Sequence, residues 1–315
     1  MKRTACEADG ERSTSKSDDS GNLQRRARES DIADITSRDF LERFRAEVDL
    51  LADELAECPA EQVISVLQQG IDQPAIGVVL AGAGMREEAL AEDLARNAGE
   101  FVPTAVSSAQ DFPRLVKVRL LASLDTAWWR SARAFRTDDE ITRSSELVDL
   151  RWARSQKSIE FAFRTQAFDP LRRAVRAADR RLWPGRTPRT IGMRLPYARW
   201  EMIGVLNSIA AEFLRWAPSS SGLWVNSLVR SIEYQEAMRG SGYTVADGSA
   251  HCVGWAADIE MAWMVRNGYG DILADILRSR AEAGQLNVID EGQAWHICLN
   301  PAVVQSDSEW SPCVE

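Results

Sequence analysis

The sequence predicts an α+β protein in which a small antiparallel sheet with flanking helices follows an all-helical region. Apolar residues recur at helical spacing through much of the first 185 residues. After the break at Trp183-Pro184-Gly185, short apolar stretches typical of strands alternate with helical ones. Strands mixed with helices in this order favour an α+β domain with an antiparallel sheet.

The chain divides into three predicted regions. Residues 1–30 are polar and charged with almost no apolar side chains, which predicts a disordered tail. Residues 31–185 form a helical region whose role the sequence does not reveal. Residues 186–315 form a second domain, which contains the predicted sheet.

Helical spacing accounts for the elements of the helical region. A first helix follows the capping residue Ser37 and ends before Pro59, because apolar residues repeat on one face between them. Further helices are predicted over residues 85–98, 113–135 and 170–183, and one or two more over residues 142–163.

The second domain combines two helices with four short strands. An amphipathic helix is predicted over residues 200–216 and is ended by Pro218 and a serine run. A second helix is expected from Gly270 to Gly284. The predicted strands cover residues 223–229, 253–259, 286–289 and 294–299.

Composition limits the class of protein. Of the 315 residues, 45% are hydrophobic and eleven are tryptophan, so the chain can bury a sizeable core. The net charge of −9 argues against general nucleic-acid binding, because phosphate neutralisation needs a basic surface. The most basic stretch has seven arginines between residues 172 and 189. We interpret it as a solvated helix face, with an anionic partner such as a cell-wall polymer as the alternative.

The chain shows no targeting segment. Its first thirty residues lack the apolar core of a secretory signal, and the longest apolar run, from Pro74 to Met85, is too short to span a bilayer. Five cysteines are sparse and odd in number, unlike a disulfide scaffold. We therefore expect no membrane segment and a cytoplasmic location by default, with export by a signal-less route as the alternative.

The only two histidines of the chain, His251 and His296, are its most informative residues. His251 begins a stretch that ends at Asp258, and His296 directly follows a tryptophan. Two imidazoles and one carboxylate provide three ligands for a tetrahedral Zn²⁺ and leave a fourth position for water, as in catalytic zinc sites. We predict one zinc ion per chain, bound by His251, Asp258 and His296. Either histidine taken alone is more typical of a hydrogen-bonded core residue.

Two blocks of sequence resemble one family. Ser249-Ala250-His251, continued by Gly254, Ala256 and Asp258 and followed later by Trp295-His296, resembles the LAS-type zinc metallopeptidases. These include D-alanyl-D-alanine carboxypeptidases and dipeptidases, phage endolysins and the amino-terminal domain of hedgehog proteins. The segment from Ser227 to Gln235 resembles the family's Ser-x-x-Arg-Ser-x-x-x-Gln block. The resemblance covers about residues 220–300.

The resemblance implies zinc-dependent hydrolysis of short peptides, most typically bacterial peptides of peptidoglycan type that contain D-amino acids. In the family the arginine, here Arg230, lies near the substrate carbonyl, where it would stabilise the developing oxyanion. The side chains expected to line the peptide cleft are Ser227, Tyr234, Gln235 and Ser249.

The sequence departs from the family at a position that bears on catalysis. Family peptidases carry a glutamate three residues before the last histidine, where it moves the proton between water and the leaving amine. Gln293 stands at this position, and an amide cannot take a proton at neutral pH. Glu291 is the expected replacement if the chain bulges near Gly292, and Asp290 is the next candidate.

Two functions therefore stay open. The first is an active zinc peptidase in which Arg230 and Glu291 are catalytic. The second is a catalytically inactive, zinc-stabilised binding or signalling module of the same fold, whose helical region binds a partner. Cys298 lies two residues beyond His296 on the same face of the predicted strand and is a minor alternative ligand.

Overall fold

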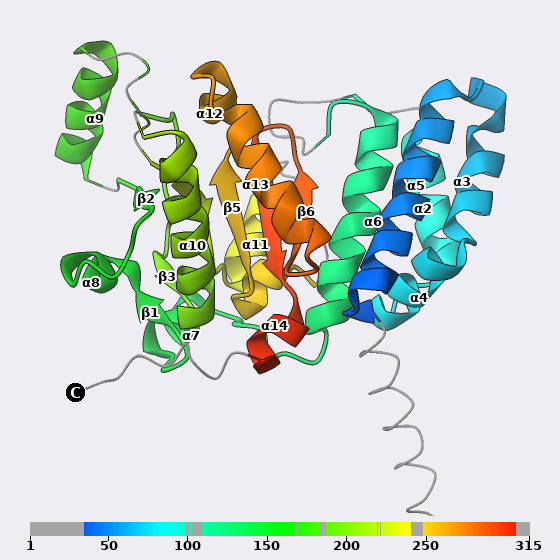
Figure 1. Cartoon of the computed structure of the whole chain (residues 1–315), viewed down its shortest axis with the longest axis horizontal. Coiled ribbons are helices and arrows are strands. Elements are labelled where there is room, and N and C mark those ends of the chain that lie inside the picture. The colour runs from blue at the N-terminus through cyan, green and yellow to red at the C-terminus, as the bar shows by residue number, and fades with distance from the viewer. Residues whose placement is uncertain are drawn as a thin grey trace, which may run out of the picture.

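The computed structural model describes residues 35–98, 101–102, 109–167, 169–182, 185, 187–218, 220, 222–240 and 248–306. The predicted tail, residues 1–30, lies outside the described residues. Figure 1 shows a sheet between two groups of helices, with the amino-terminal helices on one side and α10 (Trp200–Trp216) and α13 (Gly270–Glu282) on the other.

The main sheet has five strands. In spatial order they are β2 (Ala162–Phe163), β4 (Trp224–Ser227), β5 (Ala256–Glu260), β7 (Ala294–Leu299) and β6 (Leu286–Asp290). Neighbouring strands are antiparallel except β2 and β4, which are parallel. The predicted α+β class is therefore confirmed, and the sheet is antiparallel apart from one short edge strand.

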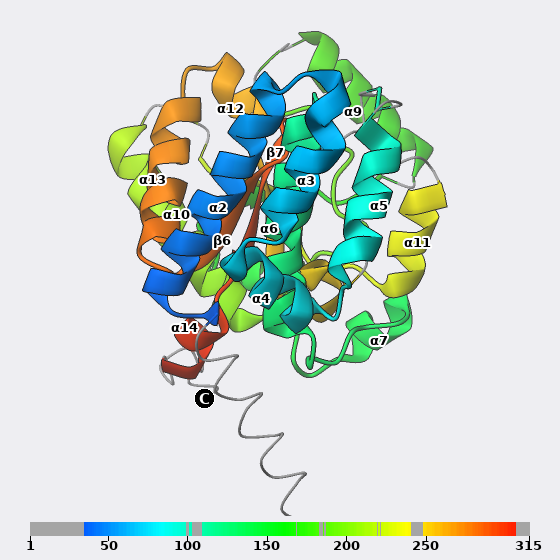
Figure 2. The same cartoon turned by 90° about the vertical axis from the view of Figure 1, so that its right-hand side faces the viewer.

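The amino-terminal helices form a layer in front of β6 and β7 in Figure 2. They are α2 (Arg38–Glu57), the 3-10 helix η1 (Ala60–Gln62), α3 (Val63–Ile71), α4 (Pro74–Ala83), α5 (Glu87–Ala98) and α6 (Phe112–Trp129). Caps set where the two longest begin: Ser37 Oγ accepts the Phe40 N–H at 3.3 Å, and Asp111 accepts the Arg114 N–H at 2.8 Å.

The prediction of one or two helices over residues 142–163 is wrong in part. This stretch contains the end of α7 (Asp138–Arg143), β1 (Val148–Asp149), α8 (Leu150–Ser155) and β2. Both strands pair with partners far along the chain, β1 with β3 (Tyr197–Ala198) and β2 with β4. Local spacing cannot report such pairing, because the ladder is completed by a distant segment. The next helix, α9 (Pro170–Leu182), lies where it was expected.

The second half matches its predicted elements closely. The helices α10 and α13 and the strands β4, β6 and β7 are confirmed to within a few residues at each end. The strand expected from residue 253 begins later, because residues 250–253 form the 3-10 helix η2 (Ala250–Val253) before β5. The remaining helices are α11 (Ile232–Gly240), α12 (Ala262–Arg266) and α14 (Pro301–Ser306).

One hydrophobic core runs through both halves of the chain, across residue 185. Trp129 at the end of α6 stacks on Trp255, with ring centroids 4.4 Å apart, and its indole N–H donates to the carbonyl of Leu299 at 2.9 Å. Arg45 of α2 donates to the carbonyl groups of Ala281 and Leu286 at 2.8 and 3.0 Å. These contacts fix the helical layer to the sheet.

The apolar run from Pro74 to Met85 is a core helix. Ile76, Val79 and Leu80 of α4 are fully buried. Within the described ranges, no single helix is long and apolar enough to cross a membrane; residues 60–71 and α4 reach that length only as a pair bent by 76°.

The contact between Trp129 and Trp255 generates the first prediction. Trp129→Ala removes a half-buried stacked ring and a part-buried hydrogen bond, so it should lower the free energy of unfolding by about 3 kcal/mol. Chemical denaturation followed by circular dichroism measures the change. Trp216→Ala is the matched control, because Trp216 is 71% exposed and its loss should cost less than about 0.5 kcal/mol. Equal losses in both variants would show that the stack does not join the two layers.

Candidate metal centre

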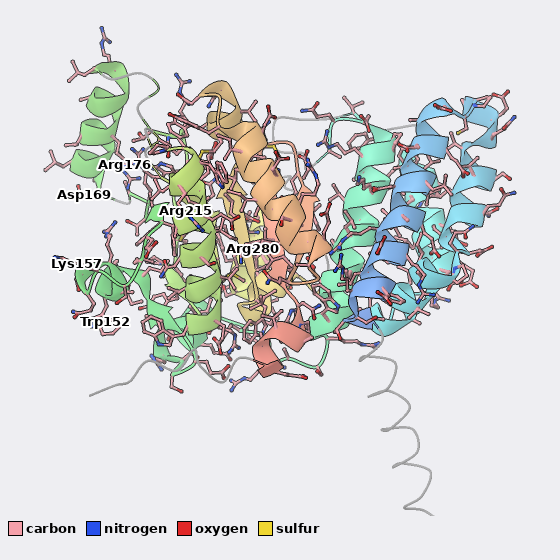
Figure 3. The ribbon with its side chains drawn as sticks, viewed as in Figure 1. Trp152, Lys157, Asp169, Arg176, Arg215 and Arg280 are labelled. Carbon is pink, nitrogen blue, oxygen red and sulfur yellow. The ribbon has the colours of Figure 1, made fainter. Side chains whose placement is uncertain are left out.

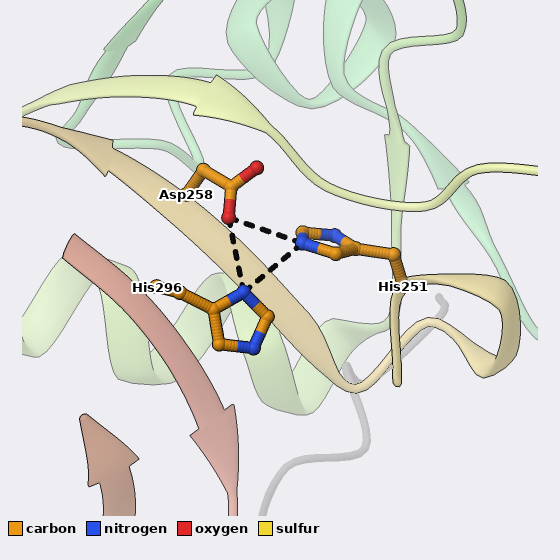
Figure 4. Close-up of side chains that lie close together, drawn as sticks. All are labelled: His251, Asp258 and His296. Atoms are coloured by element: carbon orange, nitrogen blue, oxygen red, sulfur yellow. Dashed lines mark hydrogen bonds and ion pairs between the residues drawn. The ribbon is translucent and has the colours of Figure 1, made fainter. Parts of the chain in front are cut away.

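Three polar side chains from different elements converge on one point (Figure 4). His251 Nε2 lies 3.1 Å from Asp258 Oδ1 and 3.2 Å from His296 Nδ1. His296 Nδ1 lies 3.1 Å from the same oxygen of Asp258. All three residues are buried.

Strand register brings Asp258 and His296 together. The two residues are direct partners in the antiparallel pair β5–β7. Side chains that are directly opposite in such a pair point to the same face of the sheet. His251 reaches the same face from η2, where Ser249 Oγ accepts the His251 N–H at 3.4 Å. Gly254 ends this turn with φ 81°, a left-handed conformation that favours glycine, and β5 follows.

A backbone carbonyl fixes the tautomer of His251. Its Nδ1 lies 2.6 Å from the carbonyl oxygen of Leu228. A carbonyl oxygen only accepts hydrogen bonds, so Nδ1 carries the proton and, in the neutral ring, Nε2 carries a lone pair. That lone pair points at Asp258 and His296.

A carboxylate from the helical layer fixes the tautomer of His296. Its Nε2 lies 2.9 Å from Oδ2 of Asp125, which belongs to α6 and is 3% exposed. Asp125 Oδ1 also accepts a hydrogen bond from Asn287 Nδ2 at 2.8 Å. The proton of the neutral ring therefore lies on Nε2, and Nδ1 carries a lone pair toward the other two side chains. Sequence reasoning missed Asp125; the signal available was one carboxylate within an apolar helical stretch.

The three donor atoms fit a metal ion. Two imidazole lone pairs and a carboxylate oxygen face one another with no proton between them when both rings are neutral, an arrangement that a cation stabilises. Ligands of a tetrahedral zinc ion lie about 3.3 Å apart, close to the three separations in this cluster. The buried group His251–Asp258–His296 can therefore hold a metal ion.

The pKa values show what holds the cluster together when metal is absent. Burial and the nearby charge of Arg230 lower the pKa of His251 to about 4. Burial would also lower the pKa of His296, but hydrogen bonds with Asp125 and Asp258 raise it well above its ordinary value. Burial would raise the pKa of Asp258, yet His251 and Arg230 beside it hold that pKa well below the ordinary value. A proton on His296 thus takes the place of the metal, and metal binding must release it.

The metal centre lies in the wall of a cavity of about 550 Å³. All residues predicted to form the site line this cavity together with the three ligands: Ser227, Arg230, Tyr234, Gln235, Ser249 and Glu291. The structure therefore brings the whole predicted set to one place. Their roles in binding or catalysis stay predictions.

Arg230 is held by hydrogen bonds to Asp258 and Ser227, beside the candidate metal group. Its Nη2 donates to Asp258 Oδ2, the carboxylate oxygen that faces away from the histidines, and its Nε donates to Ser227 Oγ at 2.7 Å. The Arg230 backbone N–H also donates to the carbonyl of His251 at 3.1 Å. Arg230 thus orients Asp258, and its guanidinium group lines the cavity.

The other predicted binding residues differ in the hydrogen-bonding groups that they can offer to a ligand. Gln235 is 6% exposed, and its Oε1 atom has no hydrogen-bond partner among the described residues. The Tyr234 hydroxyl accepts from Gln166 Nε2 at 3.3 Å, which leaves its own proton to donate. Ser249 serves as the cap of η2.

The tight turn between β6 and β7 distinguishes the two candidates for a catalytic base, Glu291 and Asp290. Glu291 lies in this turn beside Gly292, whose φ is 74°, so a hairpin turn and not a bulge within a strand places it in the cavity. Burial and the negative charge of Asp258 raise the pKa of Glu291 to about 7. Asp290 is exposed, pairs with Arg114 and does not line the cavity.

Gln293 also lines the cavity and anchors the turn through its backbone. Its carbonyl oxygen accepts the N–H groups of Met261 and Ala262 at 3.2 and 3.4 Å. The side chain is exposed, so it takes no part in this anchoring.

Cys298 does not belong to the converging donor group. Its thiol is buried, and both burial and the charge of Asp125 raise its pKa well above the ordinary value. A protonated thiol is a poor metal ligand, because the thiolate is the form that binds. The alternative of Cys298 as a ligand therefore has no support in the geometry.

Comparison with protein-family models, curated proteins and solved structures gives no match.

The converging donors predict close to one equivalent of zinc in the purified protein. His251→Ala and His296→Ala should each lose it, and removal of the metal by a chelator should lower the melting temperature, because binding free energy is shared with folding. Elemental analysis measures the content. Cys298→Ala is the control and should keep its zinc; loss of zinc in that variant alone would reverse the assignment of the ligands.

Asp125 generates a separate prediction. Asp125→Asn keeps the shape of the side chain but can no longer accept from both His296 and Asn287, so zinc affinity should fall about 10- to 100-fold. Competition with a chromophoric chelator measures the affinity. Ser123→Ala, a change at a buried position of α6 whose hydroxyl bonds within the helical layer, should leave it unchanged. Equal affinity in Asp125→Asn and wild type would remove Asp125 from the metal centre.

Proposed function

We propose that this protein is a zinc-dependent peptidase that hydrolyses short peptides, of the peptidoglycan type that contains D-amino acids. The observation that carries the proposal is a three-ligand metal group in the wall of a cavity that also holds a carboxyl group and an arginine. A zinc ion bound by three protein ligands activates water and polarises a carbonyl group. The blocks that resemble LAS-type peptidases support the same reaction.

The residues around the ligands suit the remaining tasks. Glu291 is the group that takes a proton from water and returns it to the leaving amine, because its carboxyl group lines the cavity and can gain and lose a proton. Arg230 positions Asp258 and offers its guanidinium group to the carbonyl oxygen as negative charge develops there. Exclusion of water from the buried ligands strengthens both interactions.

The cavity walls favour a substrate with amide groups. Gln235 Oε1 is a buried acceptor without a described partner, and a peptide N–H would satisfy it. The Tyr234 hydroxyl offers a donor close by for a peptide carbonyl. The choice of D-amino acids comes from the family resemblance and not from these contacts.

A second function has one specific observation in its favour. Gln293, and not glutamate, stands three residues before His296. If Glu291 does not replace the missing base, the protein is a zinc-stabilised binding module of the same fold, and the cavity binds a peptide without cleaving it.

The proposed role of Glu291 predicts that Glu291→Gln lowers the turnover number about 10²- to 10⁴-fold while the zinc content stays unchanged. The assay follows release of D-alanine from a stem peptide that ends in D-alanyl-D-alanine. Asp290→Asn is the neighbouring control and should keep wild-type turnover, because Asp290 lies outside the cavity lining.

Other outcomes separate the two functions. Full activity of Glu291→Gln would show that the base assignment is wrong. No hydrolysis by the wild type, together with activity gained by Gln293→Glu, would establish the inactive binding module.

A further inference from the structure

Helix α9 carries an apolar stripe that faces solvent. Leu171, Val175 and Leu182 are 71%, 61% and 64% exposed. With Ala178 they fall within an arc of about 60° on a helix of 3.6 residues per turn, and the stripe is about 16 Å long. An ordinary surface helix turns such a stripe toward the core.

The attachment of α9 explains why the stripe faces outward. Arg176 lies on the opposite side of the helix and donates from Nη2 to the carbonyl of Thr165 at 2.5 Å. Figures 1 and 3 show α9 standing at the edge of the molecule, with Arg176 labelled beside it. The helix is thus held to the protein by its polar side and presents its apolar side to the exterior.

The charge of this segment is opposite to that of the whole chain. Residues 169–182 contain five arginines and two aspartates, whereas the chain has a net charge of −9. One of these aspartates, Asp169, caps the helix by accepting the Leu171 N–H at 2.9 Å. Arg173 and Arg181 are exposed on the polar side and at the border of the stripe. At physiological salt, charges farther away than about 8 Å are largely screened, so the local positive charge decides what approaches.

The same end of the molecule carries the rim of the cavity. The Trp263 indole N–H donates at 2.8 Å to the carbonyl of Gly185, just after α9, and joins this segment to α12. Arg189, Ile191 and Arg266 are exposed residues of the cavity lining. Ile191 is 69% exposed, and Val265 beside Arg266 is 57% exposed. Apolar and cationic side chains therefore occur together from α9 to the rim.

We propose that α9 is an interfacial helix that binds the surface of an anionic lipid bilayer. Its apolar stripe would enter the boundary between headgroups and acyl chains, and the arginines beside it would contact lipid phosphates. The surface would hold the rim of the cavity close to the bilayer. This inference does not depend on peptidase activity.

Two other occupants fit the observations less well. A second copy of the chain that paired stripe against stripe would bring together two segments that each carry five arginines and two aspartates, with like-charge repulsion. A nucleic acid would engage the arginines but leave the apolar stripe in water. An anionic bilayer accommodates both features at once.

Co-sedimentation of the full chain with vesicles tests the proposal. Binding is expected to vesicles of phosphatidylcholine mixed with phosphatidylglycerol, and only weakly to phosphatidylcholine alone. The double variant Leu171→Glu/Val175→Glu should weaken binding to the mixed vesicles by about tenfold or more. Leu50→Glu is the matched control, because Leu50 is 56% exposed on α2 in the amino-terminal layer, and it should bind like wild type.

Arginine variants, high salt and a measurement of self-association complete the test. Arg173→Ala/Arg181→Ala should weaken binding to the mixed vesicles, and high salt should do the same. Absence of wild-type binding, or equal binding by the double glutamate variant, would overturn the proposal. So would a wild-type dimer in sedimentation velocity that the glutamate variant abolishes, because the stripe would then be a contact between copies. Unchanged circular dichroism of each variant ensures that lost binding is not lost folding.

Discussion

The direct pairing of Asp258 with His296 across β5 and β7 is the constraint on which the arrangement of the site depends. Once the register of these strands is set, a carboxylate and an imidazole point to the same face at hydrogen-bond distance. His251 then needs only the short turn of η2 to complete the group. A shift of either strand by one residue would move its side chain to the opposite face of the sheet, so the register of β5 and β7 also specifies the candidate metal group.

Each histidine ligand is oriented from outside by an acceptor on its other ring nitrogen. The acceptor for His251 is a carbonyl close in sequence to Arg230, whereas the acceptor for His296 comes from α6 in the helical layer. The helical layer therefore contributes directly to the site, because its residue Asp125 forms the hydrogen bond that orients His296. The stack of Trp129 on Trp255 holds the end of the same helix against the sheet.

The sequence was sufficient to predict the class of fold, the strands β6 and β7 and the three residues of the metal group. Helices and strands of the second half have strong local periodicity, and the rarity of histidine made His251 and His296 conspicuous. A carboxylate within an apolar helical stretch marked Asp125 as unusual, but its role was missed because that role depends on the packing of α6 against a strand more than 150 residues away. The strand β2 was missed for the same reason, since its pairing partner is β4.

The anchoring of the turn at Gln293 has an evolutionary consequence. The backbone carbonyl of this residue fixes the turn against Met261 and Ala262, while its side chain is exposed in the cavity. Glutamine and glutamate codons differ by a single base, and exchange of the side chain would leave the backbone contacts in place. A glutamate can therefore arise at this position by one point mutation that keeps the backbone anchor of the turn. The cavity would then gain a second carboxylate in this turn beside Glu291 without any rearrangement of the backbone.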